Sequence, residues 1–293
     1  MRPADVARLV ALAAIWGASF IFIRVLAPVL GPVITAALRV LIAGGALVAW
    51  SRLTGFDAQL ARHWRAYAII GIVNSSLPFV LYAFAALYLP ASYSVIFNSV
   101  APLFAAFLAA LFLADPLTSR KLAGLAAGAA GVALVSGARP VMTGDGFAAA
   151  VAACLAAAFC YAASGVYIKR RAASAPPMGI AAWSQIFAGV ALLPLAPFAP
   201  VRGTIDFVIV ANVLALSLVC SAIAYRLYFR LVADIGPTRA LTVTFLMPLF
   251  GMLWGALFLD EAITGPMLAG CALIVGGVAL VARASARVAA LRD

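Results

Sequence analysis

Long apolar runs, separated by short clusters of charged and turn-forming residues, follow one another along the whole chain. A helix needs about 20 residues to cross the hydrocarbon core of a bilayer. The pattern therefore predicts ten membrane-spanning helices, at residues 4–27, 32–51, 65–89, 91–114, 119–138, 146–169, 177–199, 207–232, 236–259 and 265–283. The segments between them are too short to form a separate domain. We expect an all-α integral membrane protein.

The composition agrees with this expectation. Of the 293 residues, 67% are hydrophobic and 10% are charged, and the mean hydropathy is +1.15. In soluble domains about a quarter of the residues are charged. The first apolar run starts close to Met1, but it is long enough to span and further runs follow it. We therefore interpret it as a membrane helix and not as a cleaved signal peptide.

The basic residues indicate how the chain is oriented. The formal net charge is +11. If the N-terminus lies inside, the basic clusters at 52–65, 120–121, 169–171 and 283–292 lie inside with Arg8, whereas Arg139 and Arg202 lie outside. The positive-inside rule then places both termini in the cytoplasm, and we expect a bacterial inner membrane. Since orientation explains most of the basic excess, no nucleic-acid partner is expected.

The chain repeats itself at a spacing of 146 residues. Residues 102–135 align with residues 248–281, with half of the positions identical, and the pair Leu81-Tyr82 falls on Leu227-Tyr228. We therefore predict two copies of one unit, at residues 1–140 and 141–293. Each copy holds five predicted helices, and because five is odd the second copy starts on the opposite side of the membrane. Such inverted-topology repeats are typical of secondary transporters that work by alternating access.

Several short motifs carry a family resemblance. They are WGASFIFIR at 16–24, Leu38-Arg39 after Gly31-Pro32, LPAS at 89–92, and PLFAAFLAALFL followed by an acidic residue. These motifs resemble the EamA repeat of the drug/metabolite transporter (DMT) superfamily, and the resemblance covers essentially the whole chain twice. Within the superfamily the chain looks most like bacterial aromatic amino acid and methyl viologen exporters. The resemblance implies that helices 1 to 4 and 6 to 9 surround a cavity, with helices 5 and 10 peripheral.

The first copy departs from the family pattern at one position. It carries Asp115-Pro116 where the family usually has Glu, while the second copy keeps Glu261. Because this position is a helix end that faces a loop, the departure bears little on substrate chemistry.

Pro78, Pro102 and Pro248 fall well inside predicted spans. A proline within a helix frees the carbonyl four residues earlier, and inside a membrane that carbonyl needs a new partner or a water-filled cavity. Pro78, Pro102 and Pro248 free the carbonyls of Asn74, Asn98 and Thr244. We interpret the prolines as hinges and the three polar residues as cavity lining. The alternative is a set of kinked helices whose polar groups bond to neighbouring helices.

Polar aromatic residues also lie inside the spans rather than at the membrane interfaces where Trp and Tyr usually gather. An aromatic wall suits a flat, partly apolar ligand. With a one-residue slip of the repeat, Trp16 and Tyr161 are equivalent, so we expect them on opposite walls of one pocket. Ordinary helix packing is the alternative for each of them. The candidate binding residues are Trp16, Tyr82, Tyr161, Trp183, Tyr225 and Tyr228.

Within predicted spans a charge is costly unless it faces a cavity or reaches the headgroups. Five arginines that the loops do not explain fall there, namely Arg24, Arg39, Arg226, Arg230 and Arg239, and the three nearer helix ends, Arg24, Arg230 and Arg239, are expected to reach the headgroups. Arg39 lies after the turn at Gly31-Pro32 and is predicted to bind a substrate carboxylate, with Arg226 as an analogous candidate. The alternative for both is that they extend to the headgroup region.

The absence of certain residue types from the predicted spans excludes several classes of function. All acidic residues map to loops or helix ends, and His63, the single histidine, maps to a loop. Proton relays usually need such groups at membrane depth, so facilitated diffusion is expected. No protease motif or P-loop occurs, and Cys154, Cys160, Cys220 and Cys271 show no metal-binding spacing. No enzyme activity, cofactor or metal is expected.

We therefore predict a monomeric transporter in contact with membrane lipids, whose substrate is a small amphipathic metabolite. An aromatic amino acid, exported or facilitated, fits best. Other DMT substrates, such as other amino acids, drugs, polyamines or nucleotide sugars, are the alternative within transport. A membrane protein without transport activity is the alternative outside it.

Overall fold

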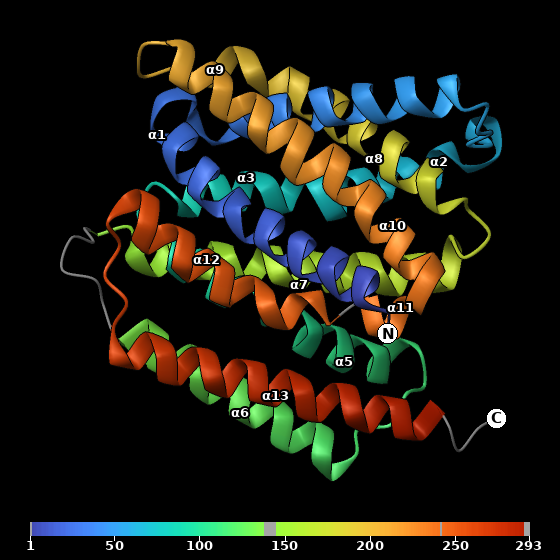
Figure 1. The fold of residues 1–293 in the computed structure, drawn as a ribbon, viewed down its shortest axis with the longest axis vertical. Coiled ribbons are helices and arrows are strands. Elements are labelled where there is room, and N and C mark those ends of the chain that lie inside the picture. The colour runs from blue at the N-terminus through green and yellow to red at the C-terminus, as the bar shows by residue number, and fades with distance from the viewer. Residues whose placement is uncertain (1, 138–144, 241, 290–293) are drawn as a thin grey trace.

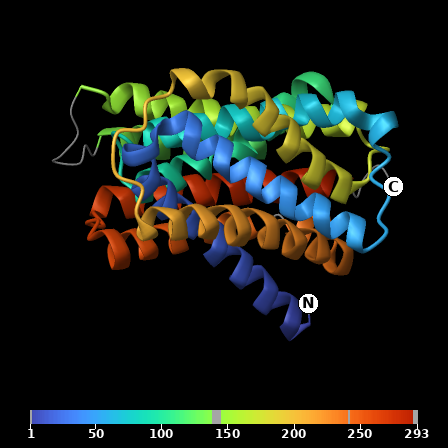
Figure 2. The ribbon, with the colours of Figure 1, turned by 90° about the horizontal axis from the view of Figure 1, so that it is seen from above.

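The computed structural model describes residues 2–137, 145–240 and 242–289. Within these ranges every regular element is helical. The helices run mostly side by side, and their connections gather at the two ends of the bundle (Figure 2). The predicted boundary between residues 140 and 141 and the predicted outside charge Arg139 lie outside the described residues.

The first half, residues 2–137, contains α1 (Pro3–Leu53), α2 (Leu60–Gly71), the π-helix η1 (Ile72–Ser76), α3 (Leu77–Ala85), α4 (Ala91–Asn98), α5 (Ala101–Phe112) and α6 (Ser119–Gly137). The second half, residues 145–289, contains α7 (Phe147–Arg171), α8 (Pro177–Leu192), the 3-10 helix η2 (Leu193–Phe198), α9 (Phe207–Leu214), the π-helix η3 (Ala215–Ile223), α10 (Ala224–Ile235), α11 (Pro237–Ala240), α12 (Val243–Leu259) and α13 (Gly265–Ala289).

Seven helical segments in the described part of the chain are long and apolar enough to cross a membrane. They are 3–53, 60–85, 91–112, 147–171, 177–198, 207–235 and 265–284, and α12 is a shorter apolar helix. The first of them, α1, has 51 residues and holds two of the predicted spans. The molecule is a multi-pass, all-helical membrane protein, and the number of ten spans remains a prediction.

The backbone of α1 bends at Gly31, whose φ of 76° and ψ of 160° are not helical. A residue with a side chain rarely adopts this φ, and Pro32 disfavours the α-helical conformation in the residue before it. In Figure 1 the chain turns back at the left, so residues 32–53 run toward the end of the bundle where α1 began. The start of α1 and the end of α13 lie at this same end.

The π-helical stretches η1 and η3 widen two composite helices at corresponding positions. Shifted by the 146-residue spacing, Ile72–Ser76 falls within Ala215–Ile223. Pro78 follows η1 closely, but the corresponding position after η3 is Ala224. A proline is therefore not required for the π-helical stretch, which is a feature common to both halves.

The helices α6 and α13 lie along each other at one edge of the molecule (Figure 1). A Cβ atom at Gly124 would stand 2.6 Å from the carbonyl oxygen of Gly277, and one at Gly131 would stand 2.7 Å from that of Gly270. Because the residue numbers increase in opposite directions, the two helices are antiparallel. Glycine at these positions lets the backbones approach closely, as in other membrane helix pairs.

Candidate functional site

Two aromatic pairs join the halves. The ring of Trp16, on α1, lies 5.5 Å from that of Tyr228, on α10. The ring of Tyr161, on α7, stacks at 6.2 Å on that of Tyr82, on α3. The 146-residue spacing, with the one-residue slip near the start of each copy, relates one pair to the other. Each of Trp16 and Tyr161 contacts a tyrosine of the other half, and their expected position on opposite walls of one pocket stays a prediction.

Tyr82 is held more firmly than its partner. It is only 2% exposed, its hydroxyl donates to Asn98 Oδ1 at 2.8 Å, and its ring meets that of Phe20 edge-on at 5.3 Å. The structure thus brings the predicted residues Tyr82, Asn98 and Tyr161 together. Buried tyrosine needs such a polar partner for its hydroxyl.

Arg39 lies on α1 and is only 7% exposed. Its Nε donates to Ser221 Oγ at 3.0 Å, across the interface between the halves. The guanidinium carbon lies 3.8 Å from the centre of the Phe79 ring, a cation–π contact. Among the described residues Arg39 forms no ion pair, since the ion pairs involve other basic residues. A buried charge without a partner is costly, so this position favours an anionic ligand.

Gln185, on α8, makes the corresponding contacts from the second half. Its side chain is fully buried. Its Nε2 donates to Ser75 Oγ at 2.9 Å and to the Tyr225 hydroxyl at 3.4 Å, while Oε1 is buried without a partner. The 146-residue spacing takes Arg39 to Gln185, Ser75 to Ser221 and Phe79 to Tyr225.

Tyr225 and Tyr161 connect these two positions. Tyr161 packs against the apolar cluster that contains Phe79, whose ring lies beneath the Arg39 guanidinium, and the Tyr225 hydroxyl accepts from Gln185. Arg39, Gln185, Tyr161 and Tyr225 therefore form one cluster, which we call the central cluster. It combines a cation, a free carbonyl oxygen, two hydroxyls and aromatic faces.

Three predicted binding residues, Asn74, Thr244 and Trp183, are not members of the central cluster. Asn74 is half-buried within η1, next to Ser75, and Thr244 is half-buried in α12. Trp183 packs in two apolar clusters around Leu47 and Tyr67 and is not part of the central cluster.

The three predicted hinge prolines differ in their settings. Pro78 and Pro102 are the second residues of α3 and α5, directly after irregular or π-helical turns, whereas Pro248 lies within the continuous helix α12. Whether any of them acts as a hinge stays a prediction.

Arg226 is separate from this site. It is exposed, and its guanidinium carbon lies 3.7 Å from the centre of the Trp50 ring at the end of α1. It therefore has the environment of a surface arginine packed on an aromatic ring, and it provides a natural control for Arg39.

Two cavities lie elsewhere on the molecule. One of about 320 Å³ is lined by Gly31, Pro32 and the 195–202 segment. The other, of about 460 Å³, lies between Phe22, Asn212 and Trp254. Neither of these two cavities is lined by a predicted binding residue.

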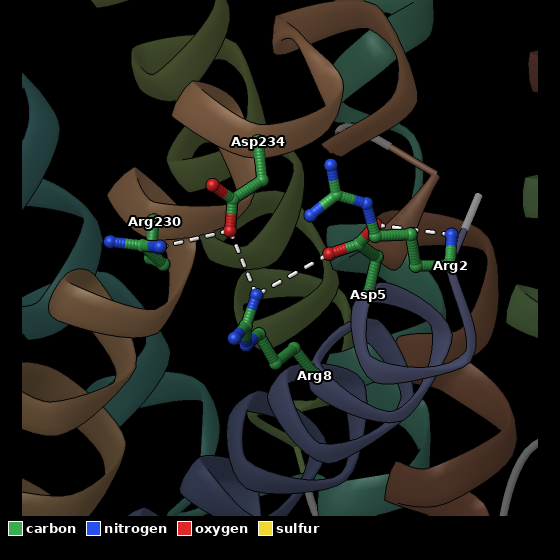
Figure 3. A network of polar contacts seen from close by, with 5 residues as sticks. All are labelled: Arg2, Asp5, Arg8, Arg230 and Asp234. Carbon is green, nitrogen blue, oxygen red and sulfur yellow. Dashed lines mark hydrogen bonds and ion pairs between the residues drawn. The ribbon is translucent and has the colours of Figure 1, made fainter.

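Polar contacts also join the halves at both ends of the bundle. At the end that carries the start of α1, Arg8 bonds Asp234 at 2.8 Å and Asp5 at 3.3 Å, and Arg230 bonds Asp234 at 2.9 Å (Figure 3). At the other end, the Glu261 carboxylate accepts hydrogen bonds from the first turn of α4.

Sequence reasoning missed Gln185, Ser75, Ser221 and Phe79, because it searched the spans for charged residues, prolines and polar aromatic residues. A signal was present: the repeat spacing places each of these residues on another member of the same set or on a predicted residue. Applied to Arg39, the spacing leads directly to Gln185. Within the described residues, no group of three potential metal ligands occurs.

The helices and the central cluster define a multi-pass membrane protein with a charged and aromatic site between its halves. The model of the EamA-like transporter family matches residues 6–137 and again residues 148–283. The chain therefore belongs to the EamA-like transporter family, within the DMT superfamily, as the sequence motifs predicted.

The relatives are distant but similar over nearly their whole length. Protein PecM of Dickeya dadantii is 25% identical over 91% of this chain and 88% of its own. A "probable amino-acid metabolite efflux pump" of Salmonella typhimurium is 25% identical over 90% of both chains. A "probable terminal-alkyne amino-acid exporter" of Streptantibioticus cattleyicolor is 27% identical over 92% of this chain and 90% of its own. One solved crystal structure matches with a TM-score of 0.68, at 22% identity, over 98% of this chain and 99% of the other, which concerns the fold alone.

Proposed function

We propose that this protein carries small amphipathic metabolites with a carboxylate, foremost aromatic amino acids, across the bacterial inner membrane by alternating access. The observation that carries the proposal is Arg39, a buried cation without an acidic partner among the described residues, beside Tyr161 and Tyr225. A carboxylate would satisfy the guanidinium, and the tyrosine and tryptophan rings would receive a flat side chain.

Alternating access rests on two inverted halves of five spans, which we propose at residues 1–140 and 141–293. The two ranges matched by the family model support this division. The reciprocal contacts of Gly124 with Gly277 and of Gly131 with Gly270 support a two-fold relation between antiparallel helices. The related pairs Trp16–Tyr228 and Tyr161–Tyr82 support it as well.

The orientation and oligomeric state follow the same architecture. The start of α1, the end of α13 and the basic connections near residues 52–65, 120–121 and 169–171 lie at one end of the bundle (Figure 1). This arrangement supports cytoplasmic termini. The glycine faces of α6 and α13 cover each other within one chain, which supports a monomer.

The proposed mechanism is facilitated transport without a proton relay. Carboxylates of the described residues lie at helix ends, as with Asp5, Asp115, Asp234 and Glu261, where basic side chains or backbone N–H groups contact them. The second candidate is a DMT transporter of another substrate class. A cationic substrate is disfavoured because the site already holds the positive charge of Arg39.

The test is flux of labelled phenylalanine, tryptophan, threonine and leucine into proteoliposomes, with and without imposed proton and sodium gradients. We expect saturable flux that does not depend on either gradient, with the aromatic substrates preferred. Trp16→Ala and Tyr161→Ala should weaken the aromatic substrates most. Arg39→Gln should raise the KM for phenylalanine by about 30-fold, because losing one buried charge-assisted contact costs about 2 kcal/mol.

Arg226→Gln is the matched control, since it removes an arginine packed on an aromatic ring at the surface. It should leave the KM unchanged. Absence of amino acid flux above that of empty liposomes, with folded protein, would exclude the proposed substrate. Flux of labelled nucleotide sugars or polyamines into the same proteoliposomes would then identify the second candidate.

A further inference from the structure

The central cluster is symmetric in its geometry and asymmetric in its chemistry. Arg39 contacts Ser221 and Phe79, and Gln185 contacts Ser75 and Tyr225. Each contact of one residue is taken onto a contact of the other by the same 146-residue spacing. The two halves thus present equivalent positions, but one holds a cation and the other a neutral amide.

Within the described part of the chain, Arg39 and Gln185 differ in the hydrogen-bonding groups that they leave without a partner: Arg39 leaves donors and Gln185 leaves an acceptor. Among the described residues, Nε is the only nitrogen of Arg39 with a hydrogen-bond partner, so its remaining N–H groups are donors. The unused atom of Gln185 is Oε1, which is an acceptor. A buried acceptor without a donor costs free energy comparable to a lost hydrogen bond. An unpartnered atom of this kind at a candidate site favours a ligand that donates.

Both positions converge on Tyr225. Its hydroxyl accepts from Gln185, it interacts electrostatically with Arg39, and it lies one helical turn after Ser221, the partner of Arg39. A small molecule held beside Tyr225 would therefore lie near both the N–H donors of Arg39 and the acceptor Oε1 of Gln185. The aromatic side chain would extend toward Tyr161, which also interacts with Arg39 and Tyr225.

We propose that Arg39 and Gln185 together bind a zwitterionic amino acid. The Arg39 guanidinium binds the α-carboxylate, and Gln185 Oε1 accepts a hydrogen bond from the α-ammonium group. The inference rests on the proposed function and narrows its substrate class to molecules that carry both groups. It makes Gln185 the residue that distinguishes an amino acid from a carboxylic acid of the same shape.

The test compares three probes with one aromatic ring: phenylalanine, 3-phenylpropionate, which lacks the ammonium, and 2-phenylethylamine, which lacks the carboxylate. Their binding to purified protein is measured by calorimetry, and their competition with labelled phenylalanine is measured in proteoliposomes. The wild type should bind phenylalanine about tenfold or more tightly than either analogue, because each analogue leaves one buried group unpaired.

Gln185→Met removes the acceptor at similar volume. It should weaken phenylalanine about tenfold and leave 3-phenylpropionate unchanged, so that the preference between them disappears. Gln185→Glu adds a negative charge at the same place and should improve 2-phenylethylamine while weakening 3-phenylpropionate. A purely structural role of Gln185 would weaken all three probes alike. Ser75→Ala is the matched control, because it removes a partner of the amide but keeps the acceptor atom itself, and the preference for phenylalanine over 3-phenylpropionate should remain.

The outcomes distinguish failure of the proposed function from failure of the zwitterion assignment alone. If the wild type neither binds nor transports amino acids, the proposed function fails and this inference with it. If phenylalanine is carried and Arg39→Gln weakens it, but the ratio of phenylalanine to 3-phenylpropionate stays the same in folded Gln185→Met and Gln185→Glu, only the zwitterion assignment fails. Should Gln185→Met not fold, the opposite responses expected of the two analogues to Gln185→Glu decide the question.

Discussion

Glu261 gives the sharpest test of how the two halves are held together. Its carboxylate accepts from the backbone N–H of Ala91 at 2.6 Å, the N–H of Ser92 at 2.9 Å and the Ser92 hydroxyl at 2.6 Å. These groups open α4, whose N-cap residue Pro90 makes no side-chain cap hydrogen bond. A glutamate 170 residues away therefore caps this helix, and its charge also complements the helix dipole.

The magnitude follows from the three bonds. Hydrogen bonds to a charged group contribute about 1.5–3 kcal/mol each, and loss of a helix cap costs about 1 kcal/mol. Because Glu261 is only half-buried, water can reach the freed N–H groups. This access of water lowers the cost below the roughly 4.5 kcal/mol that three such bonds would give at the low end, so we expect Glu261→Ala to cost about 2–3 kcal/mol in total, or a drop in Tm of roughly 4–8 °C. Glu261→Gln keeps one acceptor oxygen and should lose about half as much.

The assay is thermal unfolding of the purified protein in detergent. Asp145→Ala is the control, since it removes an exposed carboxylate from a loop. A double-mutant cycle combines Glu261→Ala with Gly255→Ala. A Cβ atom at Gly255 would stand 2.5 Å from Glu261 Oε2, so the losses of stability caused by the two changes should be less than additive. The reasoning is refuted if Glu261→Ala lowers the Tm no more than Asp145→Ala does.

Two further predictions use the same unfolding assay. Gly277→Ala should lower the free energy of unfolding by about 1–3 kcal/mol, because its Cβ would stand 2.5 Å from the Gly124 carbonyl oxygen. The neighbouring Gly276→Ala has open space around it and should raise that free energy by about 0.5–1 kcal/mol. Equal effects of the two variants would contradict the close packing of α6 on α13. Asp115→Ala should lower the free energy of unfolding by roughly 3–5 kcal/mol, because it leaves the ammonium of Lys121, which is 0% exposed, without its ion-pair partner. Lys121→Met should cost less, because the carboxylate that it leaves unpaired is 25% exposed. The opposite order of the two costs would contradict this reasoning.

The positions of most helices could be predicted from the apolar runs, because burial in lipid demands long uninterrupted hydrophobic segments. The predicted helix at 119–138 corresponds to Ser119–Gly137, and the one at 207–232 to the composite Phe207–Ile235. The predicted helix at 91–114 is divided in the structure, where α4 ends at Asn98 and α5 begins at Ala101. Pro102 explains the division, since proline near the start of a helix loses no hydrogen bond.

The candidate site was predictable only in part. Arg39 and the tyrosines were found because a charge or a polar ring within a span is unusual. The π-helical stretches η1 and η3, which carry Ser75 and Ser221, could not be predicted, because a π-helix and an α-helix show nearly the same hydrophobic pattern. Gln185 escaped because a single amide in an apolar run has no periodic signal, and its importance comes from contacts with the other half.

The contacts at the two ends of the bundle differ in strength, and this bears on alternating access. At the end with the chain termini, Arg8 is 37% and Arg230 67% exposed in their side chains, so their bonds to Asp234 contribute about 0–1 kcal/mol each. At the opposite end, Glu261 holds α4 through three hydrogen bonds to a charged group, two of them from backbone N–H groups that have no other cap. In terms of these polar contacts, opening the end with the termini therefore costs less. The alternating-access proposal accordingly expects this protein, without substrate, to open first toward the side where its termini lie. If the termini are cytoplasmic, as we propose, this is the side from which an exporter takes up its substrate.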